Sequence, residues 1–174
     1  MNLNDTTTTA RIGNTSYLDR PGGRIGYDVA GAGPLVVLVP GMGDLRAAYR
    51  FLAPALRAAG YRVACTDLRG HGDSDATFSS YGDEQTADDI AALISELGGP
   101  AVIAGNSMAA GSAVLTAAQR PELVSGLVLV GPFVRNPTVG AGRRVLLRVA
   151  MAPAVGGDLL EVLPAQAVRG PAAR

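Results

Sequence analysis

The stretch Val102-Ile103-Ala104-Gly105-Asn106-Ser107-Met108-Ala109-Ala110-Gly111 decides the fold of this chain. The apolar run over residues 101–104 predicts a buried strand, and a helix is expected over residues 109–119. Ser107 lies in the turn between them. Small residues stand two positions before and two positions after the serine, at Gly105 and Ala109. This pattern is typical of a serine held in a strained turn and exposed above the carboxyl ends of the strands.

Strand-like and helix-like patterns alternate on both sides of this turn. Apolar runs predict further strands over residues 35–39, 61–66 and 127–130, and helical spacing predicts helices over residues 46–59 and about 83–97. Ahead of them, residues 15–18 and 24–29 flank a turn-rich segment, 19–23, and predict a β-hairpin. The alternation predicts an α/β fold with a partly parallel sheet and helices on both faces.

The remaining segments carry weaker patterns. Residues 1–14 are polar and threonine-rich, and we expect a flexible tail there. After residue 131 the alternation stops. Residues 143–151 predict one amphipathic helix and residues 158–162 a turn of another, and the end of the chain is rich in Ala, Pro, Gly and Arg. The folded part is therefore expected over residues 15–131, with no internal repeat and no second domain.

Composition narrows the class of protein. Hydrophobic residues make up 48% of the chain and charged residues 17%, which fits a packed globular protein. The 15 basic residues, all arginine, balance 15 acidic ones, so no field is available to hold nucleic acid or an anionic membrane. Arginine without lysine, with many Ala and Gly, is associated with bacterial genomes rich in G and C.

Localisation can also be anticipated from the sequence. A single cysteine, Cys65, excludes an internal disulfide and fits a reducing compartment. The N-terminus does not have the pattern of a secretory signal, and the longest apolar runs are too short to span a bilayer. We expect a soluble cytoplasmic protein.

Two more motifs accompany the serine turn. Val39-Pro40-Gly41-Met42-Gly43 follows the strand predicted over residues 35–39, and Asp67-Leu68-Arg69-Gly70-His71-Gly72-Asp73-Ser74 follows the next strand. With Gly-Asn-Ser-Met at the serine turn, the three motifs occur in order over about residues 25–131. In this order and spacing they resemble the α/β-hydrolases, in particular those that carry Gly-Asn-Ser-Met at the nucleophile elbow.

The resemblance implies a site and a chemistry. Ser107 would be the nucleophile, and the backbone N–H groups of Met42 and Met108 would form the oxyanion hole. The implied reaction is hydrolysis of an ester or a carbon–carbon bond in a small-molecule ester or ketone, without a cofactor or a metal. Two positions depart from the family's usual pattern: Ala109 stands where glycine is common, and Pro40 where the oxyanion loop commonly has histidine. Ser107 as an ordinary turn residue, and glycines that merely permit a tight turn, remain open alternatives.

The catalytic triad of the family is incomplete in this sequence. Members place an acid after a later strand and a histidine after the last strand, so that the order is Ser, Asp, His. The sole histidine, His71, precedes the serine in a position that relatives fill without a catalytic role, although it is the only candidate base. No acid can be assigned. We therefore expect residues 15–131 to be the N-terminal part of the fold, residues 132–174 to begin a lid or cap, and the chain to be truncated, with weak activity or none alone.

Three other classes of function fit the sequence less well. A non-catalytic remnant, or an interaction module that self-associates through its exposed sheet edge, is an open alternative. A nucleotide-binding domain is excluded because no G-x-G-x-x-G follows the first parallel strand, and because a P-loop needs a lysine. A zinc site is excluded because one histidine and one cysteine cannot build it.

Overall fold

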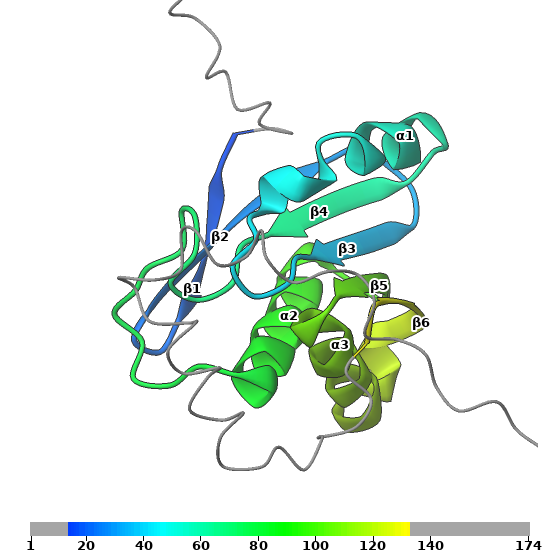
Figure 1. Ribbon diagram of the computed structural model, residues 1–174. Helices are drawn as coiled ribbons and strands as arrows, with labels where there is room; N and C mark the ends of the chain where they lie inside the picture. Colours follow the sequence, from blue (N-terminus) through cyan, green and yellow to red (C-terminus); the bar gives the residue numbers. More distant parts are fainter. Residues whose placement is uncertain (1–13, 133–174) are drawn as a thin grey trace, which may run out of the picture. The chain divides into compact units, whose positions relative to one another are not determined.

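A computed structural model describes residues 14–132 of the chain (Figure 1). Six strands form one mixed sheet in the order β1-β2-β4-β3-β5-β6. β1 and β2 pair antiparallel, as do β2 and β4, whereas β4, β3, β5 and β6 run parallel. The strands are β1 (Ser16–Arg20), β2 (Gly23–Ala30), β3 (Leu35–Val39), β4 (Arg62–Thr66), β5 (Ala101–Asn106) and β6 (Val124–Val130); the helices are α1 (Leu52–Ala58), α2 (Asp83–Leu97) and α3 (Met108–Gln119), with short 3-10 turns η1 (Arg46–Tyr49) and η2 (Pro121–Leu123).

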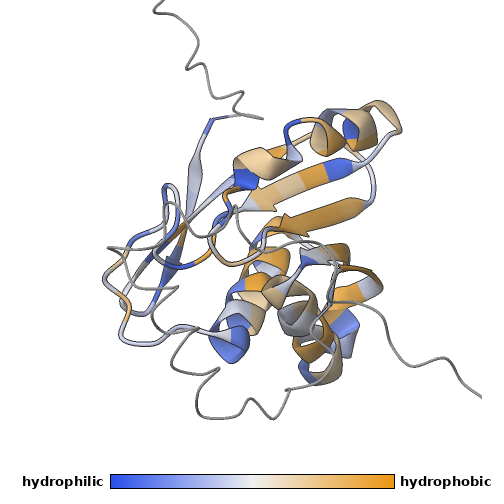
Figure 2. Ribbon diagram, viewed as in Figure 1, coloured by the Kyte–Doolittle hydropathy of each residue, from blue (hydrophilic) through white to orange (hydrophobic). Residues whose placement is uncertain are grey.

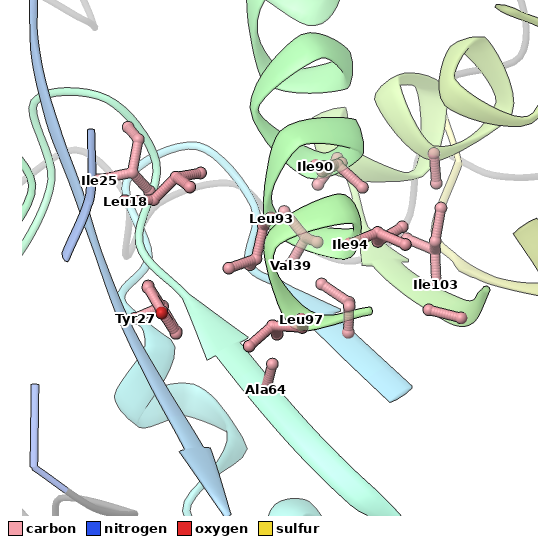
Figure 3. Close-up of a cluster of buried hydrophobic side chains, with 14 of the residues drawn as sticks. Leu18, Ile25, Tyr27, Val39, Ala64, Ile90, Leu93, Ile94, Leu97 and Ile103 are labelled. Atoms are coloured by element: carbon pink, nitrogen blue, oxygen red, sulfur yellow. The ribbon is translucent and has the colours of Figure 1, made fainter. Parts of the chain in front are cut away.

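Helices cover both faces of the sheet, as predicted (Figure 1). On one face, Ile90, Leu93 and Ile94 of α2 pack with Val39 and Ile103 of the sheet (Figure 3). On the opposite face, a second cluster joins the sheet to η1 and α1; it contains Val36, Leu38, Val63, Cys65 and Ala53, with Tyr49 and Leu56 beside them. Because β3 is covered on both faces, all five of its residues are buried, and Figure 2 shows it as hydrophobic along its whole length.

The helix predicted over residues 46–59 is wrong as a single element. The segment divides into η1 and α1, separated by Arg50 and Phe51. Pro54 is the physical reason, because its ring would clash with the carbonyl of residue 50 in a continuous helix. In the observed structure Pro54 is the third residue of α1, within the first turn, where a missing N–H costs nothing.

The other predicted elements are confirmed, most of them with shifted ends. The hairpin forms, but Asp19 pairs with Arg24 and Arg20 with Gly23, so the turn contains only Pro21 and Gly22. Gly22 has φ 94°, as the third position of a type II turn requires. α2 has the predicted bounds, β5 extends to Asn106, α3 begins at Met108, and β6 begins at Val124.

The expectations for residues 1–13 and 133–174 lie outside the described residues, including the tail and the helix over residues 143–151. None of the helices within 14–132 has both the length and the apolar composition that crossing a bilayer demands.

Candidate active site

Ser107 occupies a strained turn between β5 and α3. Its backbone has φ 55° and ψ −116°, and it is the one non-glycine residue with positive φ among residues 14–132. The Ser107 N–H donates to the carbonyl of Val130 at 2.8 Å, and the Ser107 carbonyl accepts from the Ala110 N–H at 3.1 Å. Such a conformation costs about 1–3 kcal/mol and persists where surrounding structure enforces it, often at functional sites.

The small residues around the serine are required by close backbone approach. A Cβ on Gly105 would lie within 2.7 Å of the carbonyl carbon of Ala109, a distance that real Cβ atoms do not reach. Strand β5 and helix α3 can therefore cross at this point only with glycine at position 105. The structure thus brings about the tight strand–helix approach that the sequence motif predicts.

The loop after β3 lies directly beside Ser107. Val39 and Gly105 are partners in the parallel pairing of β3 with β5, so both strands end at the same edge of the sheet. A Cβ on Gly41 would stand 3.2 Å from the Ser107 Cβ and 3.4 Å from the Asn106 carbonyl oxygen. Two motifs that are more than 60 residues apart in the sequence therefore lie against each other.

Residues 41–44 form a tight turn in this loop. The Asp44 N–H donates to the Gly41 carbonyl at 3.0 Å, and Gly43 has φ 85°. Met42 stands at the tip with 58% of its surface exposed. Within the described part of the chain, neither the Met42 N–H nor the Met108 N–H has a hydrogen-bond acceptor. The Met108 N–H is one of the unpaired donors at the start of α3, where the helix dipole favours negative charge.

The side chain of Ser107 is not committed to a structural bond. It does not cap α3, and its Oγ makes no hydrogen bond to any of residues 14–132. The residue is half-buried. Within the described residues the hydroxyl is therefore unengaged, at the carboxyl ends of the parallel strands.

His71 is engaged through both ring nitrogens. Its Nε2 accepts a hydrogen bond from the Gly43 N–H at 3.1 Å, and its Nδ1 lies 2.9 Å from the Arg69 carbonyl oxygen. A neutral imidazole has one donor and one acceptor, so the proton is on Nδ1. No hydrogen bond between His71 and Ser107 is present among the described residues.

The segment 67–74 is explained by structural bonds. The Asp67 carboxylate accepts from the backbone N–H groups of Arg46 at 2.8 Å and of Asp73 at 3.2 Å. Ser74 Oγ accepts from the Gly26 N–H at 2.9 Å. Gly72 has φ 53°, and any Cβ there would collide with the Asp67 carboxylate. The motif thus builds a rigid loop at the carboxyl ends of the strands, the same end of the sheet as Ser107.

A buried arginine near the carboxyl ends of the strands was not predicted from the sequence. Arg46 is 7% exposed and binds Asp28 at 2.7 Å, Asp73 at 2.5 Å and the Asp67 carboxylate. Burial lowers the pKa of Arg46, but the hydrogen bond to Asp73 and the charges of Asp67 and Asp28 outweigh it, so the pKa lies above its ordinary value. The available signal was Asp28, a carboxylate between Tyr27 and Val29 in the strand β2.

Comparison with known proteins agrees with this architecture. The family model described as alpha/beta hydrolase fold matches residues 34–153. The chain belongs to the α/β-hydrolase family. Among curated proteins, this family member is 31% identical over 159 residues to a 2-(acetamidomethylene)succinate hydrolase of Mesorhizobium japonicum, a match that covers 84% of this chain and 57% of the relative.

Solved structures of α/β-hydrolases have the same fold. An epoxide hydrolase from Vigna radiata is 30% identical with a TM-score of 0.66, and the match covers 77% of this chain and 44% of that one. An esterase from Exiguobacterium antarcticum is 29% identical with a TM-score of 0.65, covering 71% of this chain and 46% of the esterase. This α/β-hydrolase chain therefore spans 57% of the curated relative and less than half of each of these structures.

Proposed function

We propose that this chain is a serine hydrolase in which Ser107 is the nucleophile. The observation that carries the proposal is the Ser107 turn: the serine is the one non-glycine residue with positive φ in the described range, and its hydroxyl has no partner there. The neighbouring Gly41 supports it, because it places the loop of a second motif against the Ser107 Cβ. An ordinary turn serine would need neither feature.

The chemistry follows from the groups around the serine. Ser107 Oγ attacks the carbonyl carbon of an ester or a ketone, and the oxygen that becomes negative accepts hydrogen bonds from the Met42 and Met108 N–H groups. Collapse of the tetrahedral intermediate breaks the bond to the leaving group, which takes up the proton that Ser107 Oγ gave to a base during the attack. Water then hydrolyses the acyl–serine ester, releases the acid and restores the hydroxyl.

The proton transfer needs a base that the described residues do not supply to Ser107. The hydrogen bonds of His71 occupy both of its ring nitrogens, so we assign it a structural role and keep a catalytic role as the less favoured alternative. An oxyanion hole and binding without a complete triad leave about 10³–10⁴-fold catalysis over water. We therefore propose that residues 14–132 alone support only slow hydrolysis. Faster hydrolysis would need a base and an acid that come from outside these residues.

The substrate class is a small ester or ketone. The names of the relatives support small molecules in general, since they include an esterase and a hydrolase of a substituted succinate.

We further propose that the protein is bacterial and cytoplasmic. The one cysteine, Cys65, is a buried free thiol, which suits a reducing compartment.

Hydrolysis of p-nitrophenyl acetate tests the proposed function, with Ser107→Ala against Ser95→Ala as the matched control. Ser95 lies exposed on α2, where alanine suits the helix. The expected result is a slow, saturable rate that Ser107→Ala abolishes and Ser95→Ala retains. Equal rates in both variants would reject Ser107 as the nucleophile.

The exposed strand β6 supports a second candidate function, self-association through the sheet edge. Four successive residues of this strand are exposed: Leu127 by 37%, Val128 by 51%, Leu129 by 37% and Val130 by 54%. Because alternate residues of a strand face opposite sides of the sheet, β6 is exposed on both faces. Uncovered apolar faces beside unpaired backbone groups favour pairing with another chain. Sedimentation of the wild type against Val128→Lys tests this: loss of a concentration-dependent dimer in the variant is expected, and a wild type that is monomeric at every concentration would exclude it.

A further inference from the structure

We infer that His71 is a positioning residue, which holds the 41–44 turn so that the Met42 N–H is the donor that this turn leaves free. The inference rests on the proposed function, because a free donor matters only if an oxyanion forms at Ser107. It concerns a residue that does not touch the reacting atoms and acts through Gly43.

The tautomer of His71 sets the direction of the bond. The Nδ1–H donates to the Arg69 carbonyl at 2.9 Å, so Nε2 carries the lone pair that accepts the Gly43 N–H at 3.1 Å. The opposite tautomer would place two N–H groups against each other at Gly43. The Arg69 carbonyl therefore makes His71 an acceptor for the turn.

Hydrogen bonds within segment 67–74 hold the backbone of His71 in place. The His71 N–H donates to the Leu68 carbonyl at 3.0 Å, and the His71 carbonyl accepts from the Ser74 N–H at 2.9 Å. The same segment holds the chain a second time, just beyond the turn, where Asp67 Oδ1 accepts the Arg46 N–H at 2.8 Å. Segment 67–74 thus clamps residues 41–46 at two points, Gly43 and Arg46.

The clamp decides which donors of the turn remain available. The Asp44 N–H is used by the Gly41 carbonyl, and the Gly43 N–H is used by His71. Among the three successive N–H groups of residues 42–44, only that of Met42 has no acceptor within the described residues. Without His71, the Gly43 N–H would also be free, and one bond alone would hold a turn that needs positive φ at Gly43.

The sequence contains one histidine, so the geometry can be tested directly by NMR. In ¹⁵N-labelled protein, the ring should show a protonated Nδ1 and an unprotonated, hydrogen-bonded Nε2. A protonated Nε2, or the averaged signals of a freely exchanging imidazole, would overturn the inference.

Two variants separate the bond from the bulk of the ring. Gln in His71→Gln presents an oxygen near the position of Nε2, whereas His71→Ala removes the acceptor. Exchange of the Gly43 amide hydrogen should be about 2- to 10-fold faster in His71→Ala, as expected for one lost hydrogen bond, and close to wild type in His71→Gln. Unchanged exchange in His71→Ala would overturn the inference, and retained dispersion of the other amide signals verifies that each variant is folded.

The rate at which Ser107 reacts with a fluorophosphonate links the clamp to the oxyanion hole. We expect His71→Ala to lower this rate about 10-fold and His71→Gln to restore most of it. A rate unaffected in His71→Ala would overturn the positioning role. If the wild type shows the expected tautomer and Gly43 exchange but no labelling, the clamp is supported and the proposed serine chemistry fails, so the two failures are distinguishable.

Discussion

The backbone N–H of Ser107 donates a hydrogen bond to the carbonyl oxygen of Val130 at 2.8 Å. Val130 is the last residue of β6, the exposed strand at the edge of the sheet, and it pairs with Asn106. The turn that holds the serine is therefore tied on one side to its own helix and on the other to an edge strand. Any change that loosens the end of β6 should therefore weaken this hydrogen bond and alter the conformation of the Ser107 turn.

Val130→Gly tests this link. Glycine keeps the carbonyl but lowers the stability of the strand end by about 0.5–1 kcal/mol, so the bond to Ser107 should open more often and the reactivity of Ser107 should fall severalfold. Tyr17→Gly in β1, at the other edge of the sheet, is the control for a similar exposed strand position. Equal effects of both variants on the rate of Ser107 labelling would indicate general destabilisation and contradict the link.

Gly105→Ala should be strongly destabilising. Its Cβ would meet the carbonyl of Ala109, so strand and helix would have to separate, at a cost of about 1–3 kcal/mol or more. Gly111→Ala, inside the first turn of α3 and with nothing within 4 Å of its Cβ, should stabilise the helix by about 0.5–1 kcal/mol. Urea denaturation measures both changes, and opposite signs are expected.

Ser107→Gly should be more stable than Ser107→Ala. Both variants lose the hydroxyl, but only glycine adopts φ 55° and ψ −116° without strain. The expected difference in the free energy of unfolding is about 1–2 kcal/mol. No difference between the two variants would mean that the turn is unstrained, and would remove one reason for placing the nucleophile at this position.

Ionisation of the Cys65 thiol in the unfolded chain should lower the stability of the fold at alkaline pH. Burial, with the charge of Asp28, raises the pKa of Cys65 to about 12, so the thiol stays neutral in the folded chain while it ionises in the unfolded chain near pH 9. Stability is therefore complete below about pH 9 and falls as pH rises towards 12, by about 1–2 kcal/mol between pH 8 and pH 10. Cys65→Ala should have a flatter dependence over that range, and an identical slope would contradict the assignment.

Local signals predicted some elements accurately. α2 begins at Asp83 and Glu84, acidic residues in its first turn, and ends at Gly98, which adopts the left-handed conformation with φ 77°. The sequence of residues 105–109 likewise specified a tight turn, because glycine and alanine are the residues that a close crossing permits. In both cases the decisive interactions lie within a few residues along the chain.

Interactions between distant segments were not predictable in the same way. The helical spacing of residues 46–59 predicts only that Arg46 lies in a helix. Its side chain is buried among carboxylates that are 18, 21 and 27 residues away in the sequence. Similarly, nothing near His71 in the sequence indicates that its ring accepts the N–H of Gly43, 28 residues earlier. These contacts depend on which strand ends meet at one edge, which the sheet order β2-β4-β3-β5 decides.

Fluorophosphonate labelling followed by peptide mass spectrometry tests most directly whether Ser107 is the nucleophile. We predict a slow, stoichiometric adduct on Ser107 that is absent from Ser107→Ala and unchanged in Ser95→Ala. No adduct in the folded wild-type chain, or an adduct on another residue that persists in Ser107→Ala, would contradict it.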